Sequence, residues 1–177
     1  QPRAGRAPGR HRIEGSADGP VRRGAQVMRL QLFSDLHLES EDFDPRPAPG
    51  AELLVLAGDI DSGWDALASF AHWPVPVLMV AGNHEFDGRD LHHSWADLRS
   101  VAAGHGIRLI EREHVVITSA AGLRVRFVGT VRWSDFDGLG QAQRPRAMRA
   151  AGYFLRLMAS TRGGSCVATR QNRLRGR

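Results

Sequence analysis

Three short apolar runs, each ending in a polar turn, constrain this 177-residue chain more than any other feature. The runs cover residues 30–33, 53–56 and 77–80, and they lead into Asp35-Leu36-His37, Gly58-Asp59-Ile60 and Gly82-Asn83-His84-Glu85. Short apolar runs bounded by turn residues are typical of buried strands in a parallel sheet. Because ligands of open α/β sheets collect beyond the carboxyl ends of the strands, we expect the three turns to meet at one edge.

The polar side chains of these turns are of the kinds that bind divalent metal ions. They are two carboxylates, two imidazoles and an amide, from Asp35, His37, Asp59, Asn83 and His84. Such a mixture suits Mn²⁺, Fe²⁺ or Zn²⁺. A carboxylate between two ions can bridge them, and paired ions activate water for attack on phosphate esters. The sequence therefore indicates a metal site with phosphoester chemistry.

The same turns resemble the calcineurin-like metallophosphoesterase family. The family pattern runs D-x-H, then G-D, then G-N-H-[ED], then a further His and finally G-H-x-H. The first three blocks stand here in order and at family-like spacing, and the resemblance covers about Met28 to Arg162. It implies an α/β fold in which two sheets form a layered β-sandwich flanked by helices, with the metals at one edge.

The resemblance also implies a role for each turn residue. Asp35 and His37 would bind the first of two divalent ions, Asp59 would bridge both ions, and Asn83 would bind the second. His84 would be catalytic, since it would protonate or polarise the leaving oxygen of a phosphate mono- or diester. A metal-ligand role for His84 is the functional alternative that its residue type leaves open.

The last two blocks of the family pattern are absent. The histidines after Glu85 are His92, His93, His105 and His114, and none stands in a G-H-x-H string. In the family the later histidines complete the metal shells, and catalysis depends on that geometry. We therefore expect a truncated domain. A frameshift or a premature stop in the gene would explain the loss of the last two blocks. The alternative to an active phosphoesterase is an inactive remnant that binds metal weakly.

Other polar residues have competing interpretations. We expect Glu85 to orient a neighbouring side chain and Asp61 to lie at a helix N-terminus. Arg132 is a candidate phosphate ligand, and Trp133 could stack on a base or an apolar group. A packed loop, in which the arginine covers the tryptophan, explains that pair equally well, and Arg89 has the same ambiguity.

Charge is distributed unevenly along the chain, although the formal net charge is +5. Residues 28–140 hold nine arginines and seventeen acids, a net charge of −8, while residues 1–27 carry +4 and residues 141–177 carry +9. An acidic body fits cation binding. We expect disordered extensions at 1–27 and 163–177 around a domain at 28–162, because both ends lack apolar periodicity. Clustered arginine also allows nucleic-acid contact, an interpretation that we disfavour.

Hydrophobic periodicity predicts the remaining elements. Strands are expected over 29–34, 52–57, 75–81, 107–110, 115–118 and 123–129, and helices over 63–72, 91–103 and 145–160. This order supplies one parallel sheet and part of a second sheet. The chain has no apolar stretch of membrane-spanning length, no secretory signal and a single cysteine, Cys166. These features predict a cytoplasmic protein without a membrane partner.

Overall fold

The computed structural model describes residues 26–132, 136–138, 140–158, 161–162 and 165–166, with side chains as far as residue 151. The strands are β1 (Leu30–Phe33), β2 (Leu53–Ala57), β3 (Val77–Val80), β4 (Ile107–Leu109), β5 (Glu113–Thr118), β6 (Arg124–Gly129), β7 (Thr161–Arg162) and β8 (Ser165–Cys166). The α-helices are α1 (Leu91–Gly104) and α2 (Arg144–Met158), and the short 3-10 helices are η1 (Asp65–Phe70), η2 (His84–Phe86) and η3 (Gln141–Gln143).

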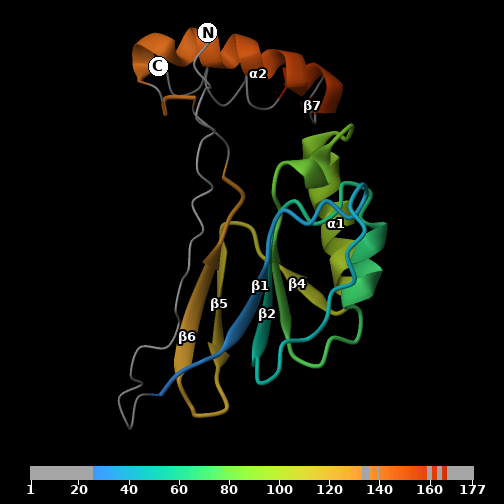
Figure 1. Cartoon of the computed structure of the whole chain (residues 1–177), viewed down its shortest axis with the longest axis vertical. Coiled ribbons are helices and arrows are strands. Elements are labelled where there is room, and N and C mark those ends of the chain that lie inside the picture. Colours follow the sequence, from blue (N-terminus) through green and yellow to red (C-terminus); the bar gives the residue numbers. More distant parts are fainter. Residues whose placement is uncertain (1–25, 133–135, 139, 159–160, 163–164, 167–177) are drawn as a thin grey trace, which may run out of the picture.

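The centre of the fold is a four-stranded parallel sheet with the order β1-β2-β3-β4 (Figure 1). Its register pairs Leu30 with Leu53, Leu54 with Val77, and Val77 with Ile107. All the strands run in the same direction, so the turns after β1, β2 and β3 leave the sheet at the same edge. This arrangement confirms the parallel sheet that the three apolar runs predict.

The two faces of the sheet are covered by different layers. On one face, strand residues such as Leu54, Leu56 and Met79 pack with residues of η1 and α1 in one hydrophobic cluster. On the other face, Leu53 and Leu78 pack against Val115 of the antiparallel β5–β6 hairpin. Figure 1 shows α1 and the hairpin on opposite sides of the sheet. The α/β layered fold, with one sheet and part of a second, is therefore confirmed.

The hairpin leaves the edge strand β1 partly uncovered. Leu30 and Leu32 are 47% and 57% exposed, and their partners Leu53 and Val55 belong to the hairpin-facing cluster. A two-stranded hairpin cannot cover four strands, so these leucines remain accessible. Such an apolar edge strand is a liability for solubility.

The predicted α-helix over 63–72 is wrong in type. The segment forms the 3-10 helix η1, preceded by Trp64 in the left-handed region at a φ of 73°. The buried residues Trp64, Leu67 and Phe70 recur every third position, which is the period of a 3-10 helix. Serine is a common N-cap residue, but Ser62 does not cap η1. The Asp61 carboxylate accepts hydrogen bonds from the backbone N–H groups of Gly63 (2.9 Å) and Ala66 (2.7 Å), which agrees with its expected place at a helix N-terminus.

The α-helix α1 agrees with its prediction. The Asp90 side chain caps its N-terminus by accepting hydrogen bonds from the backbone N–H groups of His92 and His93. Both histidine side chains are exposed. His105 follows the helix in a turn before β4.

The helix α2 also forms where periodicity predicts it, and the short strands β7 and β8 pair antiparallel. Disorder is predicted over 1–27 and 163–177, and most of these residues lie outside the described ones. The strand β8 falls within the second of these segments. Among the described residues, no helix combines the length and the apolarity needed to cross a membrane.

Candidate metal centre

The turns after β1 and β2 are held against each other in an uncommon backbone conformation. Asp35, His37 and Asp59 all have positive φ angles, of 54°, 48° and 54°. The backbone N–H of Asp35 donates to the carbonyl of Gly58 (3.0 Å), and that of His37 donates to the carbonyl of Asp59 (3.1 Å). Residues other than glycine seldom adopt this region, and it occurs preferentially at functional sites, where surrounding contacts hold it.

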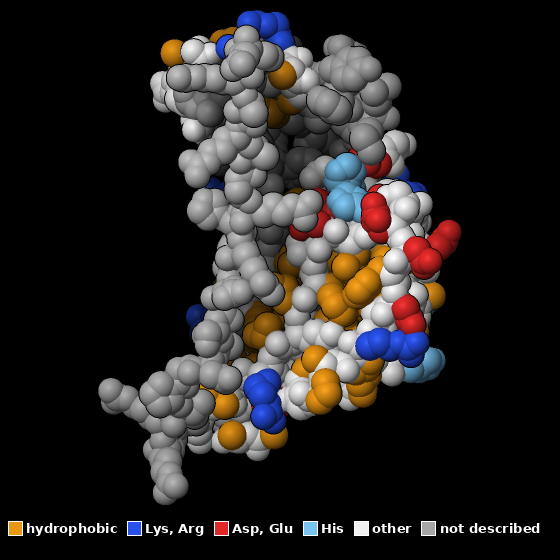
Figure 2. Space-filling model, in the orientation of Figure 1, with side chains coloured by type: hydrophobic (Ala, Val, Ile, Leu, Met, Phe, Trp, Pro, Cys, Tyr) orange, Lys and Arg blue, Asp and Glu red, His pale blue; other side chains and the backbone are white. Residues whose placement is uncertain are grey.

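Three side chains converge beyond the carboxyl edge of the sheet. The candidate donor atoms of His37, Asp59 and His84 all lie within 4.8 Å of one another, and we call these residues the metal cluster. The imidazole centroids of His37 and His84 are 4.9 Å apart. Within the part of the chain that the structure describes, no other group of three His, Cys, Asp or Glu residues meets the same distance criterion. Figure 2 shows histidine and acidic side chains gathered above a hydrophobic surface.

The donor set of the metal cluster fits a divalent ion. Imidazole and carboxylate donors suit Fe²⁺, Mn²⁺ or Zn²⁺, and all three side chains are half-buried. Half-burial reduces screening of the ligand charge while leaving an approach open for substrate. The cluster includes three of the five turn residues that the sequence predicts for the site.

Two glycines allow the second and third turns to approach each other. A Cβ atom on Gly82 would lie 2.2 Å from Asp59 Oδ1, and one on Gly58 would lie 2.8 Å from the backbone nitrogen of Gly82. Gly58 also has a φ angle of 89°. Across this contact, the backbone N–H of His84 donates to Asp59 Oδ1 (2.9 Å). The glycines therefore permit the spacing that brings Asp59 and His84 together.

The Glu85 side chain links the second and third turns through backbone hydrogen bonds. Its side chain is fully buried, and its carboxylate accepts the backbone N–H groups of Asp59 (3.0 Å), Ile60 (2.7 Å) and Gly82 (2.6 Å). Burial raises the pKa of Glu85, although these three hydrogen bonds oppose the shift. The sequence predicted that Glu85 supports a neighbouring side chain; the structure shows that it supports backbone instead.

Both histidines of the cluster contact carboxylates that the sequence interpretation missed. His37 Nδ1 lies 3.1 Å from Glu39 Oε1, and His84 Nδ1 lies 2.6 Å from Asp87 Oδ2. The only sequence signal was an acid two or three positions after each histidine. Burial opposes the charged form of His84, but the bond to Asp87 and nearby negative charges outweigh it and raise the pKa of His84. Burial also opposes ionisation of Glu39, and backbone and His37 hydrogen bonds outweigh it and lower the pKa of Glu39.

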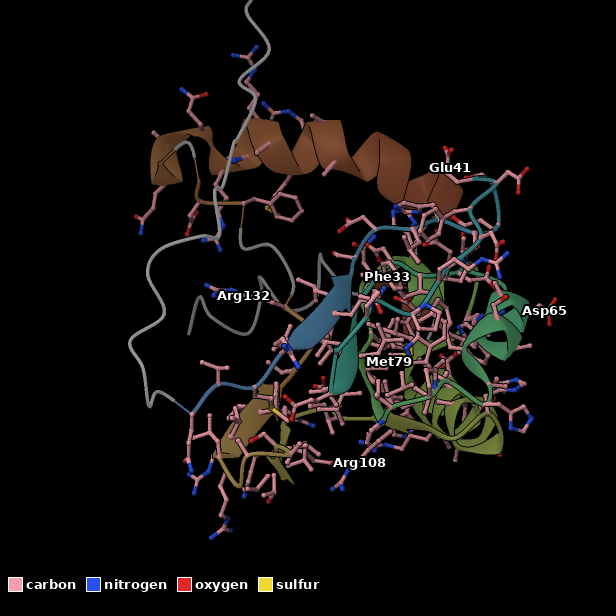
Figure 3. All side chains as sticks on the ribbon, turned by 60° about the horizontal axis from the view of Figure 1, so that its bottom comes forward. Phe33, Glu41, Asp65, Met79, Arg108 and Arg132 are labelled. Carbon is pink, nitrogen blue, oxygen red and sulfur yellow. The ribbon has the colours of Figure 1, made fainter. Side chains whose placement is uncertain are left out.

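The remaining predicted site residues lie outside the metal cluster. The Asp35 carboxylate accepts a hydrogen bond from the Ser34 hydroxyl. Asn83 lies at the N-terminus of η2, where its backbone carbonyl accepts the N–H of Phe86 (3.1 Å). Arg132 is exposed, and Figure 3 shows it away from the side of the sheet where Asp65 lies. Trp133 lies outside the described residues.

Arg89 has a packing role in the structure. Its guanidinium carbon lies 3.8 Å from the centroid of the Trp64 ring, and its NH2 group donates to the carbonyls of Ser62 and Gly63, each at 3.2 Å. These contacts link the turn after η2 to the start of η1. They support the packed-loop interpretation of this arginine.

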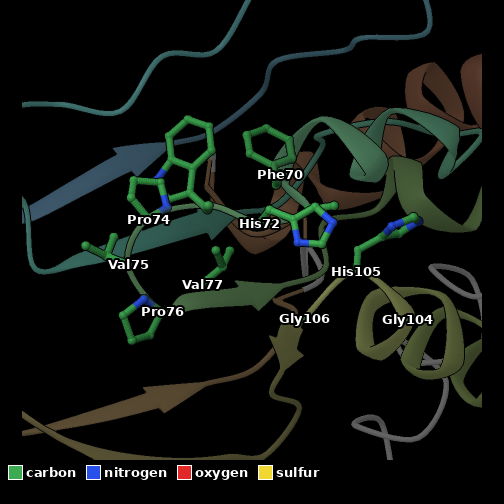
Figure 4. Close-up of a pocket in the computed structure, with 11 residues that line it drawn as sticks. Phe70, His72, Pro74, Val75, Pro76, Val77, Gly104, His105 and Gly106 are labelled. Carbon is green, nitrogen blue, oxygen red and sulfur yellow. The ribbon is translucent and has the colours of Figure 1, made fainter.

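A cavity of about 500 Å³ lies at the end of the strands opposite to the metal cluster. Figure 4 shows its lining, which consists of residues 70–77 and 104–106. These segments precede β3 and β4, so the cavity opens at the amino ends of the strands. None of its lining residues belongs to the metal cluster, and the cavity is therefore a separate feature.

The family profile described as calcineurin-like phosphoesterase matches residues 28–160, which is most of the chain. The chain belongs to the calcineurin-like phosphoesterase family. This assignment confirms the family that the three turns indicate, and metal-dependent phosphoester hydrolysis is the general chemistry of that family.

A solved structure supports the same fold. The crystal structure of phosphopantetheinyl hydrolase (PptH) from Mycobacterium tuberculosis superposes with a TM-score of 0.58 and 18% sequence identity. The match covers 84% of this chain and 60% of that one, so the chain spans less than two thirds of the length of this neighbour. The search of curated proteins found no match.

Proposed function

We propose that this chain hydrolyses phosphate mono- or diesters through a dinuclear site for Mn²⁺, Fe²⁺ or Zn²⁺. The observation that carries the proposal is the convergence of His37, Asp59 and His84 at the carboxyl edge of the sheet. Family membership supports metal-dependent phosphoester hydrolysis, and the acidic charge of residues 28–140 favours cation binding.

The proposed metal ligands follow the family pattern. Asp35 and His37 would hold the first ion, Asn83 the second, and Asp59 both. When bound, the ions would supply an activated water and positive charge for the phosphate oxygens. The hydrogen bond from the backbone N–H of His84 to Asp59 Oδ1 would hold the carboxylate in place, and Glu85 would hold the backbone of Asp59.

The remaining roles concern the substrate. His84 would give a proton to the leaving oxygen from Nε2, because Nδ1 is hydrogen-bonded to Asp87. Its raised pKa increases the protonated fraction near neutral pH. Arg132 is proposed as a weaker contact to the phosphate, for which its exposure gives access.

Turnover of aryl phosphate mono- and diesters with added Mn²⁺ tests this function. We expect the chain to release the aryl alcohol, EDTA to stop the reaction and fresh Mn²⁺ to restore it. Asp59→Asn and His84→Ala should each lower turnover about 100-fold or more, because each removes a group that acts on the reacting atoms.

The matched control is Glu41→Gln, which changes an exposed carboxylate on the first turn and should leave turnover unchanged. Stoichiometric Mn²⁺ binding without turnover would favour the inactive remnant. Turnover that survives in both Asp59→Asn and His84→Ala would contradict the proposed site.

A further inference from the structure

In each histidine of the metal cluster, the Nδ1 atom lies within hydrogen-bond distance of a carboxylate. Glu39 Oε1 lies 3.1 Å from His37 Nδ1, and Asp87 Oδ2 lies 2.6 Å from His84 Nδ1. The two carboxylates come from different turns, the first after β1 and the second after η2. The same arrangement is thus built twice, from local sequence on separate segments.

These contacts determine which nitrogen each ring presents. A neutral imidazole carries one proton, and a carboxylate beside Nδ1 stabilises the form with the proton on that nitrogen. The lone pair is then on Nε2, where it can bind an ion or accept a proton. A carboxylate on the far nitrogen also fixes the orientation of the ring and raises its basicity.

Glu39 has a second contact that links it to the turn carrying Asp59. Its Oε2 atom accepts the backbone N–H of Ser62 (3.1 Å). The Glu39 and Asp87 side chains are 29% and 18% exposed, so both bonds are partly shielded from solvent. Glu39 therefore couples the position of His37 to the turn after β2.

We infer that Glu39 and Asp87 are positioning residues with separable effects. Glu39 orients His37 as a metal ligand, and Asp87 orients His84 toward the leaving group. The division of effects rests on the proposed function, whereas the control of the imidazole tautomer by each carboxylate does not depend on it.

Nitrogen NMR of the histidine side chains tests the tautomer control without metal or substrate. At a pH where both rings are neutral, we expect His37 and His84 to carry the proton on Nδ1. In Glu39→Ala, His37 alone should lose its preference for the proton on Nδ1. In Asp87→Ala, His84 alone should lose it. Asp87→Asn keeps a carbonyl acceptor and should retain the Nδ1–H form of His84.

The controls for this measurement are Glu41→Ala and Asp97→Ala, which remove exposed carboxylates on the first turn and on α1. They should leave both tautomers unchanged. If Glu39→Ala and Asp87→Ala behave as these controls do, the inference is overturned.

Metal binding and leaving-group dependence separate the two effects. Glu39→Ala should weaken Mn²⁺ binding about 10- to 100-fold, the usual consequence of losing such a support. Asp87→Ala should leave Mn²⁺ affinity unchanged and slow an alkyl phosphodiester more than an aryl one, because an alkoxide needs a proton more than a phenolate does.

Each remaining outcome is informative. If Asp87→Ala weakens Mn²⁺ binding as much as Glu39→Ala does, His84 is a metal ligand and the division of effects is overturned. Equal slowing of both esters would also overturn it. If the wild-type chain hydrolyses neither ester, the proposed function fails, while the tautomer and Mn²⁺ measurements still decide whether the carboxylates position the rings.

Discussion

Replacing Gly82 by alanine is expected to lower turnover about 100-fold, because a small displacement of reacting groups has an effect of that size. The added Cβ atom would lie 2.2 Å from Asp59 Oδ1 and 2.7 Å from the Asp59 backbone nitrogen. Both atoms belong to the residue proposed to bridge the ions, so the substitution must displace it. We also expect the free energy of unfolding to fall by about 1–3 kcal/mol, as overpacking usually produces.

The matched control is Gly104→Ala, at the last residue of α1. A Cβ atom there meets nothing within 4 Å, so turnover should remain at the wild-type value and stability should not fall. Steady-state kinetics with Mn²⁺ and thermal unfolding of both variants provide the comparison. Wild-type turnover in Gly82→Ala would show that the close approach of the second and third turns is unimportant.

Replacing Glu85 by alanine should have the largest effect on stability. Three backbone N–H groups, from Asp59, Ile60 and Gly82, would lose their acceptor beneath the metal cluster. Each buried donor without a partner costs about 1–3 kcal/mol, so we expect the free energy of unfolding to fall by about 3 kcal/mol or more. Chemical denaturation measures this loss directly.

Glu85→Gln distinguishes hydrogen bonding from side-chain volume. It preserves the volume and one carbonyl acceptor, so its effect on stability should be smaller than that of alanine. Glu41→Ala, at an exposed position, should change the free energy of unfolding by no more than about 0.5 kcal/mol. Equal stabilities of Glu85→Ala and Glu41→Ala would contradict the role assigned to the buried carboxylate.

The sheet could be predicted from the sequence because each strand carries its own signal. The runs that become β1, β2 and β3 are apolar and end in turn residues, and parallel strands bring such ends to one edge. The approach of His37, Asp59 and His84 follows from that geometry. This part of the candidate site needed no information beyond strand order.

The supporting contacts could not be predicted in the same way. Glu85 looks like an acid beside a candidate catalytic histidine, and only the folded chain places three backbone N–H groups around its carboxylate. The error at η1 has a related cause. Trp64 turns the chain through a left-handed conformation, which is a tertiary effect that a helical pattern of apolar residues does not reveal.

The central claim is that the turns after β1, β2 and β3 form a metal centre, and Mn²⁺ titration by calorimetry tests it most directly. The wild-type chain is predicted to bind Mn²⁺, while His37→Ala and Asp59→Asn, each confirmed as folded, should bind it at least about 10-fold more weakly. Unchanged Mn²⁺ affinity in both variants, or no binding by the folded wild-type chain, would contradict the claim.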